Sequence, residues 1–480
     1  MKLSAKINFS TQFFLSLNGD IMQKSATKDL TVGSPMKLIL GFAVPMLMGM
    51  LFQQFYNVVD TMIVGKFLGK YALAGVGSTG SISFMIIGFC MGVSSGFSIP
   101  ISQMFGAKDF SAMRRYFANA IILCTIFAVV MTVLVSVFCR AILVGMDTPL
   151  EVLEYAYSYI LIIFIGIPVI YMYNLLSGVL RAVGDSKHPV MFLVIASFLN
   201  IALDLLFILG LKLGVAGAAL ATVLSQLVSG ILCLIFIMKK VDILHVNKFD
   251  FRLERHFVSK LLNMGLPMGL QYSITAIGSV ILQIAVNGQG ADVVAAVTTA
   301  GKVSMFFVCP FDALGSTMST YGGQNVGAGK LDRLSKGLKA AGFLGSAYAI
   351  IAFGVLYFFG QYFALLFMDA GETVVLAYAH KMLIWNSAFY IPLVFVNVVR
   401  FLIQGMGFSM LAILAGVSEM IARVFAALLL VPAIGYTGIC LASPLAWIFA
   451  DAFLIPAFIY SRNKLVKVMK RHADAQKSKG

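Results

Sequence analysis

Three polar residues inside strongly apolar stretches have the chemistry needed to bind a cation. Asp60 lies in the stretch 38–64 and has no basic neighbour within one helical turn. Asn200 and Asp204 are four residues apart in the stretch 189–211, a spacing that places them on one helix face. A carboxylate in lipid is costly unless it is protonated, paired or metal-bound. The two carboxylates are therefore candidates to carry a proton or a small cation, although Asp204 could instead only bond Asn200 or a neighbouring helix.

The later apolar stretches contain charged residues with less defined roles. Glu419 and Arg423 are four residues apart and can neutralise each other on one helix face, which favours a structural ion pair. Asp312 has no assigned role. Lys302 and Arg400 have side chains long enough to reach a membrane surface.

The composition predicts that helices crossing a lipid bilayer position these residues. The chain has 480 residues, of which 60% are hydrophobic and 11% charged, and its mean hydropathy is +0.94. A soluble domain carries roughly 25% charged residues, so a soluble enzyme with a single membrane anchor is excluded. At about 20 residues per span, the chain suffices for on the order of a dozen membrane helices. We place them at 38–64, 72–101, 116–139, 155–180, 189–211, 213–238, 261–287, 293–321, 338–367, 377–402, 408–432 and 434–460.

The distribution of basic residues predicts the orientation. Twelve spans put both termini on one side, and the connections on that side hold most of the Lys and Arg residues found between spans. Because basic loops stay in the cytoplasm, both termini are predicted to be cytoplasmic in a multi-pass protein of the cell membrane. The 35 basic residues against 20 acidic ones do not indicate nucleic-acid binding, because no basic stretch alternates with stacking aromatic residues.

The sequence divides into two similar halves. Three motifs recur at an offset of 221 or 222 residues: 43–46 at 265–268, 103–107 at 324–328, and 213–221 at 434–442. An even number of spans in each half gives both halves one orientation, related by an axis along the membrane normal, and two such bundles can enclose a central cavity for alternating access. The predicted domains are a polar segment 1–36, a six-helix lobe 37–238, a cytoplasmic linker 239–260, a second six-helix lobe 261–460 and a basic cytoplasmic tail 461–480.

The sequence contains no pattern typical of an enzyme. Six cysteines occur singly, without the spacing of a zinc site, and no nucleophile and base fall together within the spans, so we predict neither catalytic residues nor a cofactor. The phosphate-binding pattern GxxxxGK[ST] is also absent, which argues against ATP hydrolysis. Energy for transport would then come from an ion gradient.

Several motifs resemble the multidrug and toxic compound extrusion (MATE) transporters. They are VVDTMIVG at 58–65 with AGVG at 74–77, LRAVGDSK at 180–187 with Pro189, NIALD at 200–204, and GVAGAALAT at 214–222 with Ser225 and Gln226. The resemblance covers residues 34–460. It implies two six-helix lobes that export organic cations in exchange for Na+ or H+, with a cation site in the first lobe. The positions that match this site are Asp60, Asn200, Asp204 and Thr222, with Asn174 as a further polar match.

Glutamines and an arginine complete the predicted site residues. Gln53, Gln271, Gln283, Arg400 and Gln404 are candidates to contact substrate or to support the residues that do. One branch of the resembled family has an acidic residue in the seventh span, but here no Asp or Glu appears there, so coupling is predicted to reside in the first lobe. With 26 Met and 40 Phe the chain can provide adaptable apolar walls for varied small organic cations.

The main alternative is a flippase for a lipid-linked precursor. Its phosphate-bearing substrate would need several Arg or Lys within the spans, whereas this sequence has only Lys302, Arg400 and Arg423 there. A channel is less favoured because it needs no carboxylate pair and usually forms an oligomer around its pore. We expect a functional monomer in the lipid bilayer.

Overall fold

Long apolar stretches form helices here because a backbone in lipid must satisfy its own hydrogen bonds. The computed structural model describes residues 27–146 and 148–477, and in this part of the chain there is no strand. Ten described helices are long and apolar enough to cross a membrane, and two bent helix pairs bring the number of spans to twelve, which confirms the all-α fold of twelve spans.

The helices follow one another with short connections. In the first half they are α2 (Pro35–Leu68), α3 (Lys70–Ser78), α4 (Gly80–Ala107), α5 (Phe110–Val137), α6 (Cys139–Gly145), α7 (Leu150–Ile165), α8 (Ile167–Ala182), α9 (Lys187–Leu205), η1 (Leu206–Gly210) and α10 (Val215–Lys240). The connection contains η2 (Asp242–Leu244) and η3 (Lys248–Phe251). The second half contains α11 (Arg255–Asn287), α12 (Ala291–Gly327), α13 (Asp332–Ala364), α14 (Thr373–Ala388), α15 (Tyr390–Gly405), α16 (Ser409–Phe425), η4 (Ala426–Leu430), α17 (Val431–Ile434) and α18 (Tyr436–Lys477).

Two spans are broken where the sequence predicted continuous helices. The pair α7 and α8 bends by 48°, and the pair α14 and α15 bends by 54°. Pro168 and Pro392 lie just after these bends, and proline removes a backbone donor from the helix ladder. The bends therefore occur at corresponding places in the two halves.

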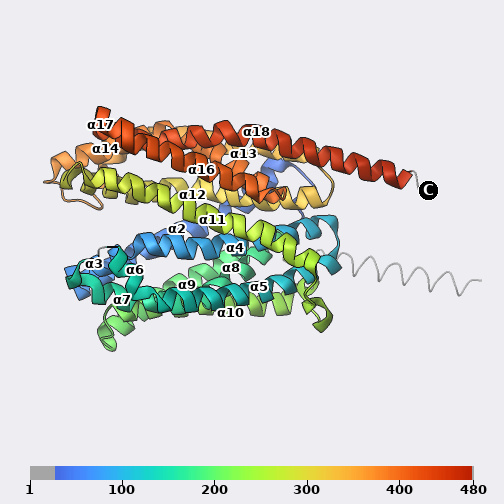
Figure 1. Ribbon diagram of the computed structural model, residues 1–480, viewed down its shortest axis with the longest axis horizontal. Helices are drawn as coiled ribbons and strands as arrows, with labels where there is room; N and C mark the ends of the chain where they lie inside the picture. Colours follow the sequence, from blue (N-terminus) through green and yellow to red (C-terminus); the bar gives the residue numbers. More distant parts are fainter. Residues whose placement is uncertain (1–26, 147, 478–480) are drawn as a thin grey trace, which may run out of the picture.

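Helices α2 to α10 form a first lobe, and helices α11 to α18 form a second lobe. The first half of α2 packs in the second lobe, and the first half of α11 packs in the first lobe. Figure 1 shows the lobes as two layers, with α2, α4 and α11 in the middle. Phe42 and Met46 of α2 belong to the hydrophobic core of the second lobe, whereas Ile63 and Val64 pack in the first. In the same way, Leu261 of α11 lies in the core of the first lobe. The lobes are thus joined by packing as well as by the chain.

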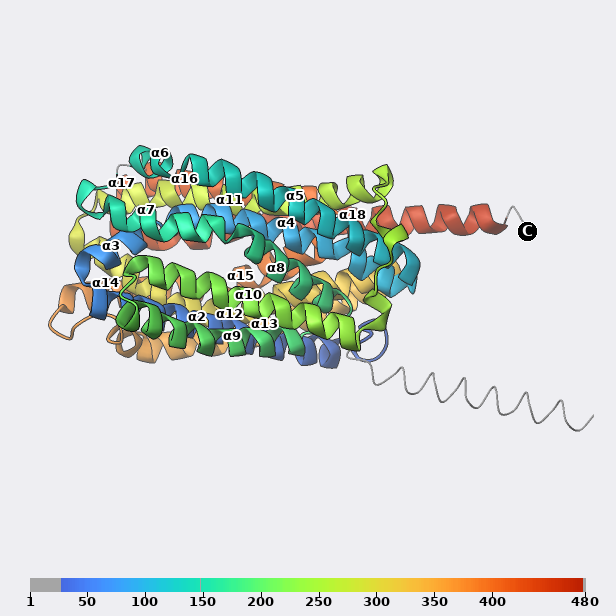
Figure 2. The same cartoon turned by 90° about the horizontal axis from the view of Figure 1, so that it is seen from below.

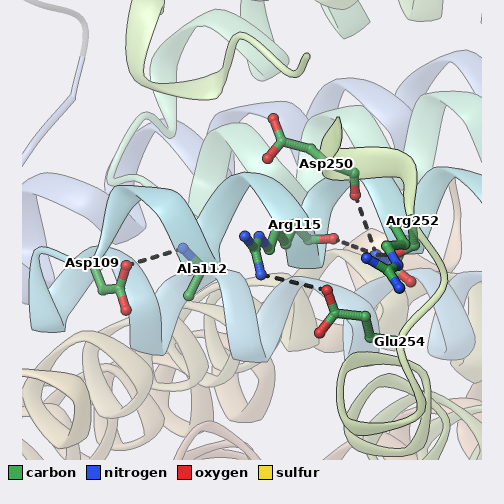
Figure 3. Close-up of polar contacts among 7 residues, drawn as sticks. Asp109, Ala112, Arg115, Asp250, Arg252 and Glu254 are labelled. Carbon is green, nitrogen blue, oxygen red and sulfur yellow. Dashed lines mark hydrogen bonds and ion pairs between the residues drawn. The ribbon is translucent and has the colours of Figure 1, made fainter. Parts of the chain in front are cut away.

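Both ends of the described chain lie at the same end of the bundle, which we call the terminal end (Figure 2). The connection between the lobes also lies there and is held against α5 (Figure 3). Asn119 Nδ2 donates to the carbonyl oxygens of Asp250 at 3.4 Å and Arg252 at 3.3 Å. Arg115 Nη1 donates to Glu254 Oε1 at 3.4 Å. This part of the predicted linker is consequently packed against the first lobe.

Candidate functional site

The fold brings Asp60 and Asp204 together from α2 and α9. The two helices pack side by side, with the rings of Phe52 and Phe198 6.4 Å apart. The two carboxyl groups are close enough to interact with each other electrostatically. A carboxylate only accepts, so a bond between these groups requires a proton on one of them, or else a cation between them.

The polar atoms around this pair are buried and have no partner. Within the described residues this holds for Asp60 Oδ1, for both carboxylate oxygens of Asp204, and for the amide oxygen and nitrogen of Asn200. Asp204 is 0% exposed and Asn200 1%. Asn200 therefore does not bond Asp204, which leaves contact between Asp204 and the neighbouring helix α2 as the remaining form of the structural alternative. Orphaned oxygens of this kind are suitable ligands for a small hard cation.

Thr222 and Asn174 make hydrogen bonds within their own helices. Thr222 Oγ1 donates to Ala218 O at 3.1 Å in α10, and Asn174 Nδ2 donates to Ile170 O at 2.8 Å in α8. These bonds use donor hydrogens only, so the oxygen lone pairs are what both side chains can offer a cation.

Two tyrosines near the carboxylates were not predicted from the sequence. Tyr56 of α2 and Tyr159 of α7 are close enough to Asp60 and Asp204 to be affected by their charge. Gln53, a predicted candidate, lies close enough to Tyr56 to interact with its hydroxyl group. Tyr56 precedes Asp60 by one helical turn, a spacing that could have identified it, whereas no sequence signal connects Tyr159 to the site.

The second lobe contains a buried ion-pair cluster that differs from the prediction. Arg400 Nη2 donates to Glu419 Oε1, and Arg423 Nη2 lies 3.5 Å from Glu419 Oε2. The predicted pair of Glu419 and Arg423 is thus present, but Arg400 is 7% exposed and does not reach the membrane surface. Asp312 and Asp451 are close enough to act on Arg400 electrostatically. The proximity of Asp451 to Arg400 was not predicted, because the sequence does not show that α18, which contains Asp451, packs against α15, which contains Arg400.

The predicted glutamines of the second lobe lie in different environments. Gln404 Nε2 donates to Gln271 Oε1 at 2.7 Å, and both side chains are buried. Gln283 is exposed and donates to Asn287 Oδ1 at 2.9 Å along its own helix. Gln271 and Gln404 thus form an inner polar pair, while Gln283 lies on the helix surface away from it.

The carboxylate pair has no counterpart in the second lobe. At the repeat offset of 221 or 222 residues, Leu282 stands where Asp60 does, Ile421 where Asn200 does, and Phe425 where Asp204 does. A π-helical segment follows both Asp204 and Phe425, namely η1 and η4. The backbone repeats while the two carboxylates and the amide do not, although Ser443 keeps a hydroxyl where Thr222 stands. The candidate carboxylate pair is therefore confined to the first lobe.

The lobes approach closely at the terminal end through a repeated glycine motif. A Cβ atom on Gly106 of α4 would overlap the carbonyl group of Gln324 in α12. A Cβ atom on Gly327 of α12 would overlap the carbonyl group of Gln103 in α4. Only glycine allows this reciprocal backbone contact.

The glutamines of the same motif hold the neighbouring helix ends. Gln103 Nε2 donates to Gly405 O at 3.0 Å, at the end of α15. Gln324 Nε2 donates to Ala182 O at 2.9 Å, at the end of α8. Each glutamine thus bonds the opposite lobe, and the terminal end is closed by two related sets of contacts.

Residues 28–31, which we call the N-terminal strap, connect the lobes at the same end. Lys28 N donates to Val183 O in the first lobe at 3.2 Å, and Leu30 N donates to Gln324 Oε1 in the second at 2.8 Å. The strap's carbonyl groups accept from Asn325 Nδ2, Lys330 Nζ and Arg333 Nη2. The sequence predicted only a polar segment at 1–36, and residues 1–26 of it lie outside the described residues. The strap is nevertheless ordered by these contacts, with Leu30 fully buried.

Comparisons with known proteins agree with this arrangement. A family model described as MatE matches residues 45–206 and 267–450. The probable multidrug resistance protein YpnP of Bacillus subtilis (strain 168) is 28% identical over 446 residues, which cover 92% of this chain and 98% of that protein. The probable multidrug resistance protein YoeA of the same organism is 29% identical over 353 residues, or 72% of this chain and 76% of that protein.

Solved structures show the same fold. A crystal structure of MATE in complex with MaL6 aligns with a TM-score of 0.85 at 24% sequence identity, covering 93% of this chain and 99% of that chain. The outward-facing conformation of a multidrug resistance MATE family transporter aligns with a TM-score of 0.84 at 24% identity, covering 92% and 98% of the two chains.

Proposed function

The chain belongs to the MatE family of multidrug efflux transporters, and from this premise we propose that it exports amphiphilic organic cations in exchange for Na+ or H+. The observation that carries the proposal is the pair of Asp60 and Asp204, which interact electrostatically and have three buried carboxylate oxygens without a hydrogen-bond partner. Two carboxylates in this position repel each other unless a proton or a cation lies with them. The site is therefore suited to exchange one positive charge for another.

Each residue has a role in this exchange. Asp60 and Asp204 supply the negative charge that balances Na+ or accepts H+, and Asn200 supplies a neutral amide oxygen. Thr222 has a spare lone pair to add. If the ion is sodium, these four residues are its ligands, and Tyr56 and Tyr159 shield the site from water.

Alternating access requires that the terminal end open and close. We place this end in the cytoplasm because of the basic residues in its loops. Opening it would break the contacts of Gly106 and Gly327 and would release the N-terminal strap from at least one lobe. When the terminal end is closed, the proposed cation site is then open only toward the outside of the cell.

A lipid-linked precursor is not favoured as the substrate. Its phosphates would need several unpaired basic residues within the spans. Of the three named there, Arg400 and Arg423 both contact Glu419, which leaves only Lys302, an exposed side chain beside the ring of Phe367. The related proteins YpnP and YoeA are named as probable multidrug resistance proteins, which also favours drug-like cations over a lipid-linked sugar.

Uptake into inverted membrane vesicles tests the proposed function. We expect vesicles that contain the protein to accumulate several unrelated lipophilic cationic dyes when a Na+ or H+ gradient is imposed, because an acidic site in apolar surroundings attracts positive charge without demanding one shape. Vesicles from cells without the protein are the control. Accumulation of a single anionic compound, or dye uptake that ignores both gradients, would contradict the proposal.

Substitution of Gly327 by Leu tests the closed terminal end. Overpacking a tight contact costs about 1–3 kcal/mol, which here acts on the closed state and lowers its population roughly 5- to 150-fold. We expect Gly327→Leu to lower dye uptake correspondingly, and a cysteine at Ser102, which is buried in the contact with α12, to react faster with a thiol reagent.

The same helix offers a matched control for this substitution. Gly301→Leu adds the same side chain to α12 at a position with open space around it, so it should transport normally. Equal transport by the two variants would show that close contact at Gly327 is not needed.

A further inference from the structure

A pocket of about 630 Å³ lies at the terminal end, where the start of α11, which packs in the first lobe, meets the second lobe, apart from the candidate cation site. It is formed by the start of α11, the turn between α15 and α16, and the last part of α18. Lys260, Asn263 and Pro267 line it from α11, and Lys464 lines it from α18. None of these residues takes part in the proposed ion exchange, so a ligand of the pocket would be distinct from the exchanged ion.

One wall of the pocket is apolar and faces outward from the bundle. Leu270, Met410 and Tyr460 line the pocket and are 47%, 64% and 57% exposed. They belong to helices that cross the membrane, so their exposed surfaces meet lipid. This wall can accept an acyl chain, because its surface is apolar and an acyl chain packed on it covers no polar group that needs a hydrogen bond.

Two lysines give the pocket positive charge. In the part of the chain that the structure describes, neither Lys260 nor Lys464 forms an ion pair. Lys464 Nζ instead lies 5.7 Å from the ring centre of Phe408 and 5.8 Å from that of Tyr460. The nearby turns of α18 add Arg462, Lys467, Lys470 and Arg471, and no acidic residue appears in this helix between Asp451 and Asp474.

We propose that this pocket binds one anionic phospholipid of the leaflet on the side of the termini. The headgroup phosphate would lie between Lys260 and Lys464, and an acyl chain would lie along Leu270 and Met410. Basic pockets between membrane helices at the headgroup level suit this ligand, whereas a cationic drug would be repelled. A free phosphate would meet the lysines but leave the apolar wall unused. The bound lipid would fasten α11, α16 and α18 to one another at the closed end of the transporter.

Lipid titration of the full-length purified protein tests the proposal. Phosphatidylglycerol or phosphatidylcholine with identical acyl chains is added to the protein in detergent, and binding is followed by native mass spectrometry and by the shift in unfolding temperature. We expect saturable one-site binding of phosphatidylglycerol and a rise in unfolding temperature that phosphatidylcholine does not produce. In the double variant Lys260→Gln and Lys464→Gln, binding should weaken about tenfold or more.

A control variant separates binding in this pocket from binding elsewhere on the basic surface. The double variant Lys239→Gln and Lys240→Gln removes two exposed charges from the same end of the first lobe and should bind like the wild type. Equal binding of phosphatidylcholine, equal stabilisation by inorganic phosphate or glycerol phosphate, or unchanged binding in the pocket variant would each overturn the proposal. Dye transport is a separate readout, so failure of lipid binding leaves the proposed exchange untouched.

Discussion

Asp204→Asn and Asp60→Asn are each expected to reduce gradient-driven export of organic cations to background while the protein still folds. Asparagine keeps the shape of the side chain but cannot balance a cation or release a proton at neutral pH. At contact distances of about 4 Å and an effective dielectric constant of about 20, one charge pair contributes about 4 kcal/mol, which is roughly a thousandfold in occupancy. Dye uptake into inverted vesicles, normalised to folded protein, measures the loss.

Two further variants bracket this result. Thr222→Ala removes one neutral ligand among several and should reduce transport only partly. Asp292→Asn removes an exposed carboxylate at the start of α12 and should transport like the wild type. If Asp60→Asn or Asp204→Asn transports at the wild-type rate, the carboxylate concerned has only a structural role.

Glu419→Gln is expected to destabilise the second lobe while leaving ion coupling intact. Glu419 contacts both Arg400 and Arg423, so the neutral side chain leaves Arg423 without its carboxylate partner and leaves Arg400 with only the more distant Asp312 and Asp451. Breaking a buried pair in this way costs about 3–5 kcal/mol. We expect a lower yield of folded protein and a lower unfolding temperature, with gradient-driven exchange per folded molecule close to that of the wild type.

A second substitution can confirm the cause. Adding Arg423→Gln to Glu419→Gln removes one of the uncompensated charges and should restore part of the stability. The opposite pattern, a stable Glu419→Gln protein that moves dye without responding to either gradient, would place coupling in the second lobe.

The sequence predicted the twelve spans well because hydropathy reflects a strong physical constraint in lipid. It did not predict the bends before Pro168 and Pro392, since an apolar stretch has the same hydropathy whether it is straight or bent. The strap at residues 28–31 was also missed. Its contacts join residues about 300 positions apart, such as Leu30 and Asn325, and a short polar segment carries no periodic pattern that indicates them.

The candidate site shows a similar division. Asp60 and Asp204 were identifiable because carboxylates in membrane spans are rare, and the structure places them side by side. The pairing of Arg400 with Glu419 joins two different helices, α15 and α16, so helical spacing gave no indication of it. For the same reason, spacing favoured the Arg423 partner within α16 and left Arg400 without a partner, as a candidate either to reach the membrane surface or to contact substrate.

Simultaneous measurement of dye and ion flux tests the central claim, that the first-lobe carboxylates exchange a cation for the exported substrate. Purified protein is reconstituted into liposomes with no imposed gradient, dye is added outside, and the movements of dye, Na+ and H+ are followed together. We predict that dye entry in the wild type drives Na+ or H+ out, and that Asp204→Asn abolishes this ion movement. Dye entry without any ion movement in the wild type, or the same ion movement in Asp204→Asn, would contradict the account.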